Sequence, residues 1–349
     1  MGRASRARQA AEQAAPPEQK AARAAERANA ERNPARALPL FDEAIRQYER
    51  LEAESPGRYP LELAQLLHRN ALTLIAGQQG QKGAVKAAEA YARFQQAQQQ
   101  GIDVQAGELA HATTTYAIGH GLMGTHDQAA HYAEEAAALW QPLADAEADA
   151  KVPDQFEARA GLAMALDEQT KALRQLARFE EAIGTGERAA AVLRQLVATV
   201  RVDELGDLLT RVHESQLARV LRHIVECQCA LKRGADAYPV CDEAIAIERR
   251  LATDLPYGAQ EPWLPMLLRL RAQLASQAQD DEAASRLLEE ALIILAPTFR
   301  LDPEPLVPEV SLLTMNYIDV QTRLGRKTNS SLLQPYIARL MQRHGMNFS

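Results

Sequence analysis

Three glycines are the first candidates for chemistry. Gly119, Gly121 and Gly124 have the G-x-G-x-x-G spacing of loops that cradle the phosphates of a dinucleotide. Such a loop must follow a strand and open a helix, so that backbone N–H groups face the phosphates. Here the glycines end the helical segment ELAHATTTYAI, and no strand-like run precedes them. We therefore interpret them as glycines of inter-helix packing and of a turn, and we predict no nucleotide site.

A group of histidines is the second candidate. His120, His126 and His131, together with Asp127, are residue types that bind transition metals. Their spacings of six and five residues place them on different faces of a helix or across a turn. We interpret them as solvated turn histidines, and the sequence predicts no metal site.

Catalytic patterns of other kinds are incomplete. His213 and Glu214 begin the zincin pattern, but Leu217 occupies the position of the second histidine. No serine, histidine and acid arrangement comes with the strand-to-helix elbow that exposes a catalytic serine. The longer segments 137–160 and 190–215 could conceal an enzyme, but they lack glycine loops and histidine clusters. We predict that the chain is not an enzyme and uses no cofactor.

Cysteine usage and charge restrict the compartment and the partners. Cys227, Cys229 and Cys241 fit neither a disulfide framework nor a zinc knuckle, and we expect them to be buried in a reducing compartment. A formal charge of −7 over 349 residues gives no electrostatic reason to bind a phosphate backbone. The N-terminus lacks the apolar core of a signal peptide, and no segment approaches the ~20 apolar residues of a membrane span. We expect a cytoplasmic protein that binds neither nucleic acid nor membrane.

The composition predicts helices. Alanine, leucine, glutamine, glutamate and arginine dominate, and aromatic residues are 5%, which is typical of a mostly helical protein. Residues 1–31 contain Pro16-Pro17 and almost no large apolar side chain, so we expect a flexible or frayed-helical N-terminal arm. From Leu38 onward, apolar residues recur at spacings of three and four. Residues 32–349 are therefore the predicted folded domain.

Pairs of small residues, seven positions apart, recur along this domain. The pairs are Ala37 and Ala44, Gly83 and Ala90, Ala129 and Ala136, Ala182 and Ala189, Ala237 and Ala244, and Ala284 and Ala291. Seven residues are two helical turns, so both members lie on one face and let a neighbouring helix approach closely. The first three pairs are 46 residues apart, and the later spacings are 53, 55 and 47. This periodicity predicts a tandem array of helical hairpins.

Each small-residue pair marks the second helix of a hairpin, and the first helices lie between them. They are expected at about 61–78, 107–122, 156–176, 210–231, 263–278 and 308–324. Helix-breaking segments such as Ser55-Pro56-Gly57 and Val152-Pro153-Asp154 precede them. A looser seventh unit runs from about Pro308 to the end, and its helix SLLQPYIARLMQRHG could cap the last apolar face.

Two segments resemble a known repeat. LARFEEAIGTGERAAAVL and ALKRGADAYPVCDEAIAI resemble the turn and second helix of the tetratricopeptide repeat, and the resemblance extends from about residue 32. The segment EAIRQYERLEAESPGRYPLELAQLLHRNALTLIAGQQGQ is similar to the longer repeats of many actinobacterial tetratricopeptide proteins. The resemblance implies an all-α, right-handed α-solenoid of about seven hairpins, with a capping hairpin at its C-terminus. It also implies that the first helices line a concave groove for a peptide or protein.

The repeat spacing of the family, carried over to this chain, implies a set of groove residues. They are His68, His111, Thr114, Asp167, Lys171, Arg174, Arg219, Arg222 and Arg269. The basic members would make the central and C-terminal groove positive, which suits an acidic peptide or a free carboxylate because arginine binds carboxylates bidentately. Alternatively, these arginines pair with glutamates of adjacent helices.

The sequence therefore predicts a protein–protein interaction module or scaffold that binds a peptide or protein in a concave groove, with an acidic peptide as one candidate partner. The alternative is a regulatory sensor that binds a small ligand or signalling peptide and controls an effector protein. The array could also associate with a second copy of itself, as a homo-oligomer, through one of its ends. Trp140 and Trp263 lie near helix ends; we expect them to serve in packing, and the alternative is an exposed hot spot for binding.

Overall fold

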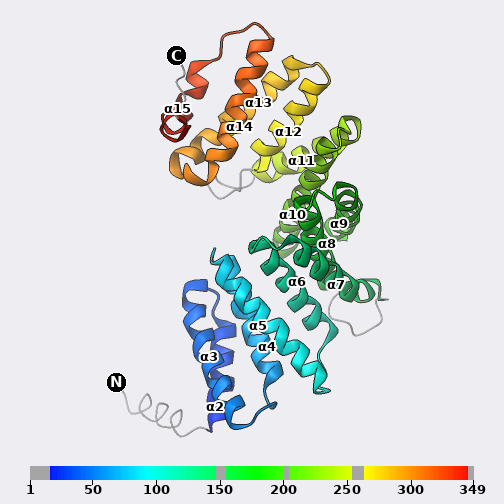
Figure 1. The fold of residues 1–349 in the computed structure, drawn as a ribbon, viewed down its shortest axis with the longest axis vertical. Helices are drawn as coiled ribbons and strands as arrows, with labels where there is room; N and C mark the ends of the chain where they lie inside the picture. Colours follow the sequence, from blue (N-terminus) through cyan, green and yellow to red (C-terminus); the bar gives the residue numbers. More distant parts are fainter. Residues whose placement is uncertain (1–15, 147–154, 200–203, 254–262, 345–349) are drawn as a thin grey trace. The chain divides into compact units, whose positions relative to one another are not determined.

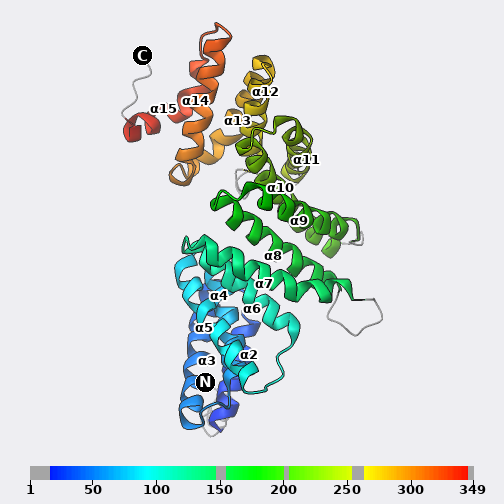
Figure 2. The same cartoon turned by 45° about the vertical axis from the view of Figure 1, so that its right-hand side comes forward.

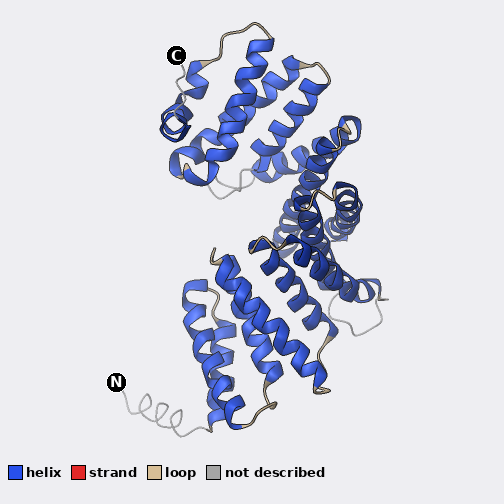
Figure 3. Cartoon of the chain, viewed as in Figure 1, coloured by secondary structure: helices blue, strands red, loops and turns tan. Residues whose placement is uncertain are grey.

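The computed structural model describes residues 16–146, 155–199, 204–253 and 263–344 (Figure 1). Within these ranges every regular element is a helix, and no strand is present (Figure 3). None of the helices described there has both the length and the apolar content needed to cross a membrane. The chain divides into two compact units, Met1–Leu176 (unit 1) and Ala177–Ser349 (unit 2).

Unit 1 is a series of helices in which each packs against the next, side by side in both Figure 1 and Figure 2. The helices are α2 (Pro17–Ala30), α3 (Pro34–Glu54), α4 (Pro60–Ala76), α5 (Gly80–Gln99), α6 (Ala106–Leu122), α7 (His126–Asp145) and α8 (Gln155–Gln175). Helices α2 and α3, α4 and α5, and α6 and α7 form hairpins. The first helices also contact one another, α4 with α6 and α6 with α8, so they form a continuous layer within unit 1.

Unit 2 repeats this arrangement. Its elements are α9 (Phe179–Thr199), α10 (Glu204–Ala230), α11 (Gly234–Thr253), α12 (Trp263–Gln277), α13 (Asp281–Leu301), the short 3-10 helix η1 (Glu304–Leu306), α14 (Val307–Arg323) and α15 (Ser330–His344). Each α-helix again packs against the next, and α12 contacts both α10 and α14. The predicted first helices are confirmed to within a few residues, except that α10 begins earlier, at Glu204.

The recurring small residues hold the hairpins together. Every member of the predicted pairs is buried, with an exposed fraction of 0–2% for the alanines. At Gly83 a Cβ atom would lie 2.6 Å from Cγ1 of Ile75 and 3.1 Å from the carbonyl oxygen of Ala71, both in α4. Larger side chains at such positions would push the two helices of a hairpin apart. The packing role predicted for these pairs is therefore confirmed.

The N-terminal segment is more ordered than its composition suggests. Residues 17–30 form α2, which packs on α3, and its residues Ala21, Ala24 and Ala28 are almost fully buried. These alanines lie along one face, and an alanine loses no side-chain entropy on burial. A stripe of small side chains thus packs closely where large apolar side chains are absent. The expected frayed arm is corrected for residues 17–30, while residues 1–15 lie outside the described ranges.

The glycine-rich segment at the end of α6 is structural. A Cβ atom at Gly119 would lie 3.1 Å from the Cα atom of Ala84 in α5, so the two helices meet there almost backbone to backbone. Gly124 has a φ of +75° in the turn before α7, a conformation that other residues rarely adopt. The sequence interpretation of these glycines as packing and turn residues is confirmed.

Trp140 joins three helices of unit 1. This α7 residue is 2% exposed, and its indole Nε1–H donates a hydrogen bond to Thr114 Oγ1 in α6 at 3.2 Å. The indole also lies against Gly161 of α8, where a Cβ atom would come within 2.4 Å of Cε2 of the ring. The packing role predicted for Trp140 is therefore confirmed, and Gly161 provides the space for it.

Substitution of Gly161 tests this contact. We expect Gly161→Ala to destabilise the protein by about 1–3 kcal/mol, because the indole must move away from the new methyl group. The matched control is Gly184→Ala, at an exposed position inside α9 where a Cβ atom meets nothing within 4 Å. That change should stabilise by about 0.5–1 kcal/mol, since alanine is the better helix former. Urea unfolding measures both, and equal effects of the two substitutions would contradict the packing account.

Candidate functional site

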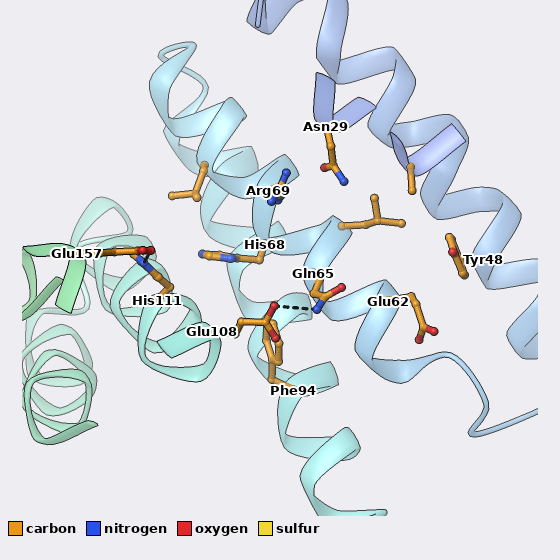
Figure 4. Close-up of a pocket in the computed structure, with 13 residues that line it drawn as sticks. Asn29, Tyr48, Glu62, Gln65, His68, Arg69, Phe94, Glu108, His111 and Glu157 are labelled. Carbon is orange, nitrogen blue, oxygen red and sulfur yellow. Dashed lines mark hydrogen bonds and ion pairs between the residues drawn. The ribbon is translucent and has the colours of Figure 1, made fainter. Parts of the chain in front are cut away.

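A cavity of about 480 Å³ opens on the first-helix layer of unit 1. Helices α4 and α6 supply most of its polar lining, namely Gln65, His68, Glu108 and His111, and the first turn of α8 adds Glu157. Figure 4 shows these side chains around the opening, with residues of α2 and α3 on the opposite side. The cavity therefore spans successive hairpins.

A hydrogen bond to a glutamate recurs at equivalent positions between successive first helices. Gln65 Nε2 of α4 donates to Glu108 Oε1 of α6 at 2.9 Å, and His111 Nε2 of α6 lies 3.2 Å from Glu157 Oε1 of α8. In both pairs the donor is the sixth residue of its helix, and the acceptor is the third residue of the next first helix. These bonds tie neighbouring first helices together across the cavity surface.

His68 lies at the centre of the lining. Its Nε2 atom is 2.9 Å from Thr115 Oγ1, and the Thr115 hydroxyl already donates to the carbonyl oxygen of His111 at 2.9 Å. His68 is therefore the donor to Thr115, with its proton on Nε2. Burial, the largest cause, together with the neighbouring His111 and Arg69, lowers the pKa of His68 to about 4. The imidazole is consequently neutral at neutral pH.

The charge of the cavity is acidic. Glu62, Glu108 and Glu157 line it, and Arg69 is the one guanidinium among the lining side chains of the described chain. Glu62 is half-buried and Glu157 is exposed. Because His68 is neutral, it does not balance these carboxylates.

Of the groove residues implied by the resemblance, two meet in this cavity and two are buried. His68 and His111 both line it, with ring centroids 6.4 Å apart. Thr114 is fully buried, and its hydroxyl donates to the carbonyl oxygen of Ala110 while accepting from Trp140. Asp167 is 3% exposed. Thr114 and Asp167 thus belong to the packed interior and not to an open surface.

The basic residues of the implied groove are distributed over both units. Lys171 and Arg174 lie in α8 of unit 1, and Nζ of Lys171 pairs with Glu168 at 2.7 Å. Arg219 lies in α10 of unit 2, half-buried. The implied basic residues therefore belong partly to unit 1 and partly to unit 2.

Two arginines of unit 2 are held by carboxylates. Arg222 is 8% exposed, pairs with Glu226 at 2.6 Å and lies over the ring of Trp263, 4.6 Å from its centroid. Arg269 pairs with Glu309 of α14 at 2.6 Å, in a contact where both side chains are largely buried. For these residues the structure shows ion pairs with glutamates, in one case on an adjacent helix.

Unit 2 has a cavity of its own, of about 590 Å³, between α12, α13 and α14. Arg269 and Arg323 line it, together with Gln273, Asn316 and the exposed Leu312. Both guanidinium groups are engaged, Arg269 by Glu309 and Arg323 by Asp281 at 2.9 Å. This cavity presents amide and apolar groups more than free charge.

The histidines considered as metal ligands have other surroundings. His120 Nδ1 lies 2.8 Å from Thr125 Oγ1, and its ring stacks on Tyr132 with centroids 5.4 Å apart. Burial lowers the pKa of His120, so this residue is less solvated than predicted. In the described ranges, no group of three or more His, Cys, Asp or Glu side chains is arranged to hold a metal ion.

Sequence reasoning missed the carboxylates of the cavity. Glu62, Glu108 and Glu157 are spaced 46 and 49 residues apart, close to the repeat length, and each is the third residue of its helix. The sequence therefore contains this spacing. The spacing does not by itself indicate a site, because the helix dipole alone also favours a glutamate in the first turn of a helix.

Comparisons with known proteins identify the fold. No protein-family model matches the sequence, and a search of curated proteins finds no match. Among solved structures, the assembly chaperone of RpL4 (Acl4) aligns with a TM-score of 0.54 and 19% identity, over 81% of this chain and 91% of that chain. BtubC from P. vanneervenii aligns with a TM-score of 0.52 and 17% identity, over 76% and 92%.

A third similar structure is of a protein with a tetratricopeptide repeat sensor. It is a signal transduction ATPase with numerous domains and a tetratricopeptide repeat sensor, from Pyrococcus horikoshii. It aligns with a TM-score of 0.51 and 12% identity, over 90% of this chain and 42% of that chain. With the helical hairpins described above, this similarity defines the class: the chain has an all-α fold of tetratricopeptide-like hairpins, of the α-solenoid type, as its sequence predicted.

The neutral state of His68 leads to a pH-dependent prediction. Between about pH 6.5 and pH 4 the unfolded chain binds a proton at His68 that the folded chain does not, so stability falls as the pH falls through this range. At about pH 5 the loss from this residue should be at most roughly 2 kcal/mol. In His68→Gln, which keeps a neutral donor for Thr115, that part of the acid sensitivity should disappear.

Thermal unfolding at about pH 7.5 and pH 5 measures this effect. Fluorescence of Trp140 reports on unit 1 when the other tryptophan is removed by Trp263→Phe. An equal drop of the unfolding midpoint in the His68 variant and its parent would rule out this role of His68.

Proposed function

We propose that the chain is a protein-interaction module and that it binds a segment of a partner protein in the cavity of unit 1. The observation that carries the proposal is the cavity itself, which extends over α4, α6 and the start of α8 and is lined by polar groups of successive hairpins. A surface built from several repeats suits an extended segment, because each repeat offers one set of contacts to successive residues of the ligand.

The lining combines the two kinds of contact that such a segment needs. Leu72 is 40% exposed and offers an apolar surface at the edge of the cavity. Asn29 and Gln65 offer amide groups, which donate and accept hydrogen bonds. The fold shared with the assembly chaperone of RpL4 is compatible with a protein as partner.

The proposal does not include an acidic partner. That prediction depended on free arginines in the groove, and Arg222 and Arg269 are in ion pairs with Glu226 and Glu309. The alternative role as a small-ligand sensor gains no support from the geometry, since the lining is spread over helices of several hairpins.

Site-specific photo-crosslinking tests the proposed function. A photoreactive benzoylphenylalanine at position 72, in place of Leu72, should crosslink partner proteins in a native lysate. The matched control places the same residue at Val85, which is 54% exposed on α5 and does not line the cavity. An excess of the unlabelled wild-type chain should suppress specific products. The proposal fails if positions 72 and 85 give the same products, or if competition removes none of them.

A further inference from the structure

We infer that the cavity of unit 1 selects partner segments that carry a lysine or arginine side chain. This inference rests on the proposed function, because it names the chemistry of the segment that the cavity accepts. Its basis is the juxtaposition of Glu62, Glu108 and Glu157 around one cavity whose central imidazole is neutral (Figure 4).

The carboxylates come from three successive first helices. Each is the third residue of its helix, in α4, α6 and α8, so the contacts between these helices bring the three into one row along unit 1. Arg69 is the one lysine or arginine among the lining side chains of the described chain. A cationic side chain in the cavity would therefore meet an excess of negative charge, whereas an anionic one would be repelled.

These carboxylates retain capacity for a ligand. Glu108 and Glu157 each accept from a side chain of the preceding first helix, Gln65 and His111. An ionised carboxylate offers about four acceptor positions, so each can accept further hydrogen bonds. Glu62 lies in α4, the first of the three helices. In the part of the chain that the structure describes, no donor to its carboxylate is seen.

The surroundings also suit the long stem of a basic side chain. Lysine and arginine carry apolar methylene groups that pack along apolar surface while the charged end reaches polar groups. Leu72 supplies such a surface at the edge of the cavity, and the buried Tyr48 lies beside Glu62 in its wall. One side chain could thus contact Leu72 through its stem and a glutamate through its charged end.

The main competing explanation is local. Glutamates in the first turn of a helix interact favourably with the helix dipole, and that alone would account for each of the three. It predicts no preference for basic ligands. Neutralising the glutamates therefore separates the two explanations when binding is measured together with stability.

The experiment selects a displayed library of random peptides on the immobilised full-length chain. Three proteins are compared: the wild type, the cavity variant Glu62→Gln, Glu108→Gln and Glu157→Gln, and a control variant. The control is Glu49→Gln, Glu54→Gln and Glu134→Gln, which changes the net charge equally at exposed positions of unit 1 away from the cavity. Circular dichroism and unfolding midpoints establish that all three proteins are folded.

We expect peptides with lysine or arginine at fixed positions to be enriched on the wild type and the control, and not on the cavity variant. In fluorescence anisotropy, replacing the basic residue of a selected peptide with glutamine should weaken binding by about fivefold or more. Raising the salt concentration from about 50 mM to about 500 mM should also weaken it.

Two other outcomes would overturn the inference, and they differ in whether the proposed function stands. If the wild type and the cavity variant enrich the same peptides, and Leu72→Asp loses them, the cavity binds peptides without selecting basic residues. The proposed function then stands and the inference falls. If Leu72→Asp enriches the same peptides as the wild type, the cavity is not the binding site and both fail.

Discussion

Close approach of helices at small residues is the constraint on which the rest of the structure depends. The small residues of the six recurring pairs are almost fully buried, and at Gly83 the second helix of a hairpin lies directly against the first. Helix α2 packs in the same way, through buried alanines in place of large apolar side chains. Because packing of this kind repeats along the chain, each helix finds its place from its nearest neighbours. The layer of first helices in unit 1 follows from it, and with that layer the cavity.

A second level of contacts is built on that layer. The bonds from Gln65 to Glu108 and from His111 to Glu157 occupy equivalent positions in successive repeats. They link helices that are neighbours in space but separated in sequence by one intervening helix. Trp140 acts beneath them, since it packs on Gly161, bonds to Thr114 and contacts the ring of His111, with centroids 4.6 Å apart. The polar surface of the cavity is therefore supported on one side by the packed interior of α6, α7 and α8.

Charged residues serve different purposes in the two units. In unit 2, arginines form ion pairs between helices, as Arg269 does with Glu309 and Arg323 with Asp281. Such pairs satisfy both partners and leave little charge for a ligand. In the cavity of unit 1, Glu108 accepts from the amide of Gln65 and Glu157 accepts from the ring of His111, so neither is paired with a lysine or arginine there. A count of charges along the sequence does not distinguish these situations, because pairing depends on the distance between helices.

The sequence by itself determined the helical class, the hairpins and most helix limits, because apolar periodicity, breakers and small-residue pairs are local signals. It also determined the packing role of Gly119 and Trp140. It placed His68 and His111 on the surface that the cavity occupies, but put the buried Thr114 and Asp167 there too. Only the tertiary structure decided which carboxylates gather and which arginines pair. Those outcomes depend on the rotation of each helix against its neighbours, to which residues in distant repeats contribute together.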